Sequence, residues 1–118
     1  MSSKTPPLKR GDIILVPFPF TDLFGSKVRP AIIVSADPQQ QDIVIAFISS
    51  VVDKPGNSDV VLENKNPDFP KTGLKKTSVF KMGKLLTVDS VLAIRHLGHA
   101  PSSLLLVLEK ALRSALNL

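Results

Sequence analysis

The chain has no cysteine among its 118 residues. Disulfide bonds, thiolate-bound metals and a cysteine nucleophile are therefore excluded. The only histidines are His96 and His99, and a spacing of three places their side chains on opposite faces of a strand. The sequence also lacks the glycine-rich loops that hold nucleotides and the nucleophile elbow of hydrolases. We therefore expect neither a metal site nor a cofactor.

Long apolar runs are also missing, since no stretch approaches the roughly 20 apolar residues of a membrane span. Residues 1–8 are polar and contain proline, without the apolar core of a signal peptide. We therefore expect a cytoplasmic protein with no membrane association. Hydrophobic residues still make up 43% of the chain, and this length fits one domain. Residues 1–9 are predicted to be a flexible lead-in, and residues 10–118 a single domain.

Acidic residues are absent from one stretch that is rich in lysine. The chain has 15 basic and 10 acidic residues, for a net charge of +5. Five lysines and no acid lie between residues 71 and 84: Lys71, Lys75, Lys76, Lys81 and Lys84. Positive charge this closely spaced favours a polyanion, most often a phosphate backbone. A solubilising surface is the alternative interpretation.

Short apolar runs between turn residues predict a mainly β fold. Strands are expected over residues 12–16, 29–36, 43–52, 59–63, 77–82 and 85–89. Gly83 separates the last two and suits a bulge or a sharp bend. Residues 64–76, which contain two prolines, are expected to form a long irregular connection.

The C-terminus has a different pattern, because five leucines recur at helical spacing: Leu104, Leu105, Leu108, Leu112 and Leu116. A helix is predicted over residues 102–116, with Ser102 or Ser103 as its N-terminal cap. Short strands and one terminal helix indicate a small curled sheet or a partly open barrel that the helix closes.

Arg29 stands at the start of the second apolar run, and Pro30 restricts it to an extended backbone. A guanidinium held there, beside a loop and on a basic protein, suits an anionic partner. The third run ends in Ser49 and Ser50, an unusual choice unless the hydroxyls face water or a ligand. A surface arginine and strand-end serines are the ordinary alternatives.

Three segments together resemble the MazF/PemK family of type II toxin–antitoxin ribonucleases. They are Arg10-Gly11-Asp12-Ile13-Ile14, the loop with Gly25-Ser26, and Arg29-Pro30-Ala31-Ile32-Ile33-Val34-Ser35. The resemblance continues through Ile48-Ser49-Ser50 and residues 78–89, and covers nearly the whole chain from residue 9. It implies an SH3-like small barrel with a C-terminal helix, of the MazF, CcdB and PemK kind. It also implies a homodimer, a cognate antitoxin as partner, and metal-independent cleavage of single-stranded RNA.

The resemblance assigns catalytic roles to Arg29 and Ser49, with Ser49 in place of the family's threonine. Arg29 would stabilise the phosphate during attack by the RNA 2′-hydroxyl, and Ser49 would position a phosphate oxygen. RNA binding is expected from Asp22, Lys27, Ser50, Lys81 and Lys84. The family's acidic residue falls on Gly83, so activity without that carboxylate is in question, and Asp22 is the nearest replacement base.

Other functions fit the same sequence. The chain could be a non-catalytic RNA-binding member of this fold, or a gyrase poison of the CcdB type. It could also be a plain SH3-like interaction domain whose lysine face binds an acidic protein. Cleavage of RNA that depends on Arg29 and Ser49 would distinguish the nuclease from all of these alternatives.

Overall fold

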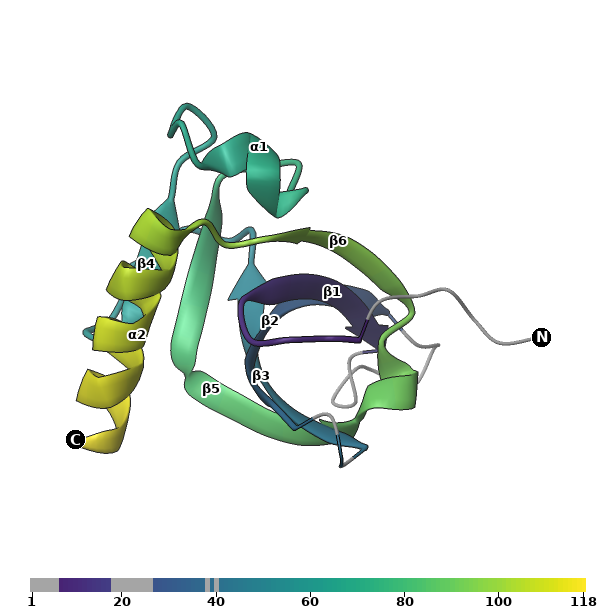
Figure 1. Ribbon diagram of the computed structural model, residues 1–118. Helices are drawn as coiled ribbons and strands as arrows, with labels where there is room; N and C mark the ends of the chain where they lie inside the picture. The colour runs from purple at the N-terminus through teal and green to yellow at the C-terminus, as the bar shows by residue number, and fades with distance from the viewer. Residues whose placement is uncertain (1–6, 18–26, 38, 40) are drawn as a thin grey trace.

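A computed structural model describes residues 7–17, 27–37, 39 and 41–118. Within them, six strands form one antiparallel sheet in the order β4-β5-β3-β2-β1-β6. The strands are β1 (Asp12–Pro17), β2 (Val28–Ala36), β3 (Asp42–Ser49), β4 (Asp59–Leu62), β5 (Ser78–Asp89) and β6 (Arg95–His99). The helices are α1 (Phe69–Thr72), the short 3-10 helix η1 (Ser90–Leu92) and α2 (Ser102–Leu116). The sheet curls into a half-barrel with α2 along one side, which confirms the predicted fold class (Figure 1).

The central strands are apolar on both faces because each face covers a different hydrophobic cluster. Ile13 and Ile32, which pair across β1 and β2, pack with Phe80 and Leu108 beneath α2. Their neighbours Ile14, Ala31 and Ile33 belong to a second cluster on the other face. The alternation of side chains along a strand sends successive residues to opposite faces. The continuous apolar runs of the sequence therefore reflect burial on both sides.

β5 is one continuous strand where the sequence predicted two. The pairing with β3 shifts between Ala46, opposite Leu85, and Phe47, opposite Lys81. The extra residues of β5 form an irregularity around Gly83, where the strand bends sharply (Figure 1). The predicted bulge or bend is present, but the ladder continues through it, so the prediction of two separate strands was wrong.

The predicted helix over residues 102–116 has the expected bounds, but its cap differs. Pro101 occupies the N-cap position, with no side-chain hydrogen bond there. The hydroxyl of Ser103 instead donates to the carboxylate of Asp68 at 2.6 Å. Ser103 therefore connects α2 to the segment before α1. Leu116, predicted to lie on the apolar face, is 48% exposed.

The connection between β4 and β5 is more ordered than the sequence indicated. Pro70 lies in the first turn of α1, which buries Phe69 and Thr72. Gly73 ends this helix with a positive φ of 73°, a conformation that glycine adopts without steric cost. Pro70 and Gly73, interpreted as loop signals, are thus the first-turn and C-cap residues of a short helix.

Candidate active site

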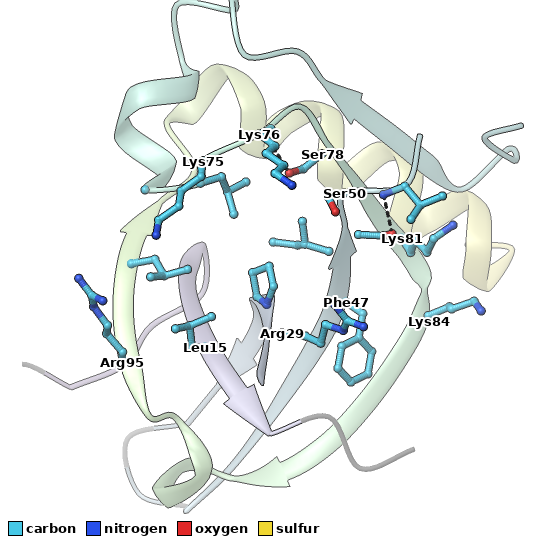
Figure 2. A pocket seen from close by; sticks show the side chains of 17 residues that line it. Leu15, Arg29, Phe47, Ser50, Lys75, Lys76, Ser78, Lys81, Lys84 and Arg95 are labelled. Carbon is cyan, nitrogen blue, oxygen red and sulfur yellow. Dashed lines mark hydrogen bonds between the residues drawn. The ribbon is translucent and has the colours of Figure 1, made fainter. Parts of the chain in front are cut away.

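A cavity of about 530 Å³ opens on the sheet beside α1 and β6 (Figure 2). Four of the predicted site residues line it together with Arg29: Ser49, Ser50, Lys81 and Lys84. The described part of the lining contributes six cationic side chains: Arg29, Lys75, Lys76, Lys81, Lys84 and Arg95. It also contributes three serines, and its apolar members include Leu15, Phe47 and Ile48. No described lining residue is acidic, so the cavity suits an anion with an apolar part.

The cavity lies where β2 and β3 separate. Their ladder begins at Ala31 opposite Phe47, whereas β3 continues to pair with β5 as far as Ser49. Pro30, the residue before Ala31 on β2, has no N–H to donate to a ladder. Continuing the same register would bring Arg29 opposite Ser49. The separation of the strands instead leaves both residues lining the cavity.

Arg29 is exposed and lies in an extended strand, as Pro30 predicted. Its backbone pairs with Val16 of β1, a residue that is 1% exposed. The backbone of Arg29 is therefore held against a buried residue of the neighbouring strand. Figure 2 shows the guanidinium of Arg29 on the side of the cavity where Phe47 lies.

Ser49 ends β3 in a turn made by its own side chain. Its hydroxyl oxygen accepts a hydrogen bond from the backbone N–H of Val51 at 3.0 Å (Figure 2). The sequence predicted that this strand ends at Val52. The turn explains why β3 ends at Ser49 instead. A hydroxyl that accepts through oxygen still carries its own proton to donate. Ser49 is therefore held in place and keeps a donor for a ligand.

Lys81 is more constrained than an ordinary surface lysine. Its ammonium lies 3.5 Å from a carboxylate oxygen of Asp59, and its side chain is 28% exposed. The same oxygen of Asp59 accepts a hydrogen bond from the N–H of Gly56 at 2.9 Å. Asp59 does not line the cavity, so it fixes Lys81 from outside and offsets part of its charge. Lys84, at the bend of β5, is exposed.

Gly83, where the family's acid was expected, faces away from the cavity. A Cβ at this position would lie 3.6 Å from Cβ of Ser58 and 3.7 Å from Cβ of Ala115. These residues belong to the segment before β4 and to α2. A carboxylate at position 83 would therefore point toward α2. The glycine alone does not remove a base from this cavity.

One other predicted RNA-binding residue is not brought to the cavity. Lys27 is exposed and does not line it, and Asp22 lies outside the described residues. Arg95 was not predicted as a site residue. It reaches the cavity because β6 pairs with β1 and places Arg95 opposite Leu15. Lys75 and Lys76 belonged to the lysine-rich stretch but were not assigned to the site.

The described residues contain no group of three or more His, Cys, Asp or Glu that could hold a metal ion. Nε2 of His96 lies 3.5 Å from Oδ1 of the buried Asp12. His96 belongs to β6, which pairs with β1 along the edge that β2 does not occupy. No helix in the described ranges is long and apolar enough to cross a membrane.

Comparison with known proteins identifies the family. Residues 9–116 match the family model of the PemK-like, MazF-like toxin of type II toxin–antitoxin systems. The chain belongs to this family. Comparison of this PemK/MazF-like chain with curated proteins gave no match.

Solved structures show the same fold at low sequence identity. Mycobacterium tuberculosis toxin MazF-mt6 superposes with a TM-score of 0.71 and 20% identity, covering 91% of this chain and 97% of that one. MazE–MazF from Deinococcus radiodurans gives 0.72 and 18%, covering 96% and 99%. An endoribonuclease in complex with its cognate antitoxin, from a mycobacterial species, gives 0.68 and 19%, covering 94% and 96%. This PemK/MazF-like chain therefore spans nearly the full length of each relative.

Proposed function

We propose that this chain is the toxin of a type II toxin–antitoxin system and acts as a metal-independent endoribonuclease on single-stranded RNA. Family membership supports the toxin assignment. The observation that carries the activity is the cavity itself, where Arg29 and Ser49 lie together with further cations and no described acid. An apolar floor between cations suits a nucleotide, whose base is apolar on its faces and whose phosphate is anionic.

In the proposed reaction, the 2′-oxygen of the RNA attacks the adjacent phosphorus. The bond from phosphorus to the 5′-oxygen breaks, leaving a 2′,3′-cyclic phosphate and a 5′-hydroxyl end. The 2′-hydroxyl loses its proton, and the departing 5′-oxygen gains one. Because the nucleophile belongs to the RNA, DNA is not a substrate.

Arg29 and Ser49 stabilise the negative charge that develops on the phosphate oxygens. The planar guanidinium of Arg29 donates two parallel hydrogen bonds, which matches the geometry of two phosphate oxygens. Ser49 donates its hydroxyl proton while the N–H of Val51 holds its oxygen. Donors fixed before the reaction stabilise such charge without reorganising. Asp22 stays the nearest candidate for the base that accepts the 2′-hydroxyl proton.

The expected partners follow from the family and its solved relatives. Two of these relatives are complexes of a toxin with its antitoxin, so we expect a cognate antitoxin for this chain as well. A homodimer of a domain spanning residues 10–118, acting in the cytoplasm, stays part of the proposal.

The test is cleavage of a random-sequence pool of single-stranded RNA by the purified protein in the presence of a chelator. We expect new 5′-hydroxyl ends at a short recurring sequence, and 2′,3′-cyclic phosphates on the matching fragments. Placing 2′-deoxyribose at the cut position should abolish cleavage there. If RNA binds but no ends form, the chain is a non-catalytic RNA-binding member of the fold. If RNA neither binds nor is cut at low salt, the nuclease proposal is wrong.

Removing the Ser49 hydroxyl is expected to slow cleavage moderately. Ser49→Ala should lower the single-turnover rate about 10- to 100-fold, since one uncharged donor to the phosphate is lost. Ser49→Thr, which keeps the hydroxyl, should retain most activity. Ser114→Ala on α2 is the matched control because Ser114 is exposed and does not line the cavity. A rate for Ser49→Ala equal to the control would remove Ser49 from the mechanism.

A further inference from the structure

The segment after α1 forms one wall of the cavity and carries two of its cations. We call residues 73–76 the lysine arm. All four line the cavity, with Leu74 half-buried and Lys75 and Lys76 exposed. β6 continues this wall with Arg95 and Leu97. Figure 2 shows Lys75, Lys76 and Arg95 around the upper and left rim, away from Arg29.

Two glycines bring α1 and the start of the lysine arm into direct backbone contact with β6. A Cβ on Gly73 would lie 2.1 Å from the carbonyl oxygen of Leu97. A Cβ on Gly98 would lie 2.4 Å from the carbonyl oxygen of Lys71. Neither position accepts a side chain without backbone movement, so the two elements pack as closely as backbone allows. The backbone that leads into Lys75 and Lys76 is therefore packed against the strand that carries Arg95.

Hydrogen bonds fix both ends of the lysine arm. The hydroxyl of the fully buried Thr72 donates to the carbonyl of Phe69 at 2.6 Å and accepts from the N–H of Leu74 at 3.2 Å. At the other end, the hydroxyl of Ser78 donates to the carbonyl of Lys76 at 2.7 Å. A long surface lysine normally loses rotamer entropy on binding. A fixed backbone at least removes the further cost of ordering the loop.

Arg95 and Arg29 belong to strands on opposite sides of β1, so they enter the cavity from different sides. Leu15 of β1 pairs with Arg95 on one side and with Pro30, next to Arg29, on the other. The backbones of Arg95 and Arg29 are thus two strand spacings apart, about 10 Å. The apolar residues Leu15 and Pro30 occupy the floor between them.

We propose that the lysine arm and Arg95 form a second phosphate-binding subsite, which holds a neighbouring phosphate of the RNA strand whose scissile phosphate contacts Arg29. The nucleoside between the two phosphates lies over the apolar floor. This inference rests on the proposed function for the identity of the strand. The subsite contributes to binding and not to bond cleavage, because its cations lie away from the reacting phosphate.

The test measures salt dependence of binding with a strand that cannot be cleaved. The probe is a fluorescent, random-sequence, single-stranded oligonucleotide with 2′-deoxyribose throughout, titrated at several salt concentrations. For single strands, each phosphate contact contributes about 0.7 to the slope of log affinity against log salt. The double variant Lys75→Ala/Lys76→Ala should lower the slope by up to about 0.7, because the subsite holds one phosphate.

A second double variant separates the subsite from net charge. Lys65→Ala/Lys110→Ala also removes two exposed lysines, neither of which lines the cavity. It should leave the slope nearly unchanged. Equal slopes for the two double variants overturn the subsite, although RNA cleavage would still support the nuclease. If the unmodified chain binds no oligonucleotide even at low salt, the subsite and the proposed function both fail.

The bracing of the lysine arm is tested through Thr72. Thr72→Val keeps the shape of the side chain but removes both hydrogen bonds, whereas Thr72→Ser keeps the hydroxyl. We expect Thr72→Val to weaken oligonucleotide binding severalfold, and Thr72→Ser to weaken it less. In the Lys75→Ala/Lys76→Ala background, Thr72→Val should have no further effect on affinity. Additive losses there would show that Thr72 acts through stability alone and would overturn the role of the braced arm.

Discussion

Replacing Arg29 with alanine is expected to lower the single-turnover cleavage rate by at least about 10²- to 10³-fold. The guanidinium supplies charged donors to the phosphate. Among the described residues of β2 and β3 that line the cavity, Arg29 is the only cation. Arg29 is itself exposed, so the variant should fold. The measurement is cleavage of a defined single-stranded RNA with enzyme in excess, together with the melting temperature.

Two further variants identify which property of Arg29 matters. Arg29→Lys keeps the positive charge but cannot donate two parallel hydrogen bonds, so it should recover only part of the rate. Arg113→Ala removes an exposed arginine of α2 that does not line the cavity, and should leave the rate unchanged. A cleavage rate for Arg29→Ala within about threefold of the unmodified chain would contradict the proposed mechanism.

The strands and the terminal helix could be predicted from sequence because their signals are local. Leucines at helical spacing gave α2 its bounds, and apolar runs between turn residues gave most strands. The errors arose where a contact overrode the local pattern. Val51 and Val52 have strong β propensity, yet Ser49 turns the chain with its own hydroxyl before them. Ser103 is a good N-cap residue, but its hydroxyl is used by Asp68, which is distant in the sequence.

The part of the cavity wall that β6 supplies could not be predicted because it depends on strand order. Arg29 and Ser49 could be predicted because they belong to family motifs, and the lysine-rich stretch could be predicted from its charge. Arg95 carries neither signal and reaches the cavity only because β6 pairs with the outer edge of β1. The glycines where α1 and the lysine arm meet β6 are 25 positions apart, at residues 73 and 98, so each looks like an ordinary turn residue. The orientation of Gly83 toward α2 likewise depends on the bend in β5.

Phe80→Ala is expected to give the largest loss of stability, about 3–5 kcal/mol in the free energy of unfolding. Phe80 is 0% exposed and lies between Ile48 of β3 and Val60 of β4 in the cluster beneath α2. Truncation removes the ring and leaves a cavity that neighbouring strands cannot easily close. Natural domains are stable by about 5–15 kcal/mol, so this loss is a large share of the total.

The loss at Phe80 also bears on the site because the next residue, Lys81, pairs with Phe47 at the edge of the cavity. Phe80→Leu, which refills part of the volume, should be clearly less destabilising than Phe80→Ala. Val61→Ala, on the adjacent strand but 37% exposed, should cost less than about 1 kcal/mol. Urea denaturation followed by circular dichroism measures all three. Similar midpoints for Phe80→Ala and Val61→Ala would contradict the burial of Phe80, and with it the packing of β5 against α2 that orients Lys81 and Lys84.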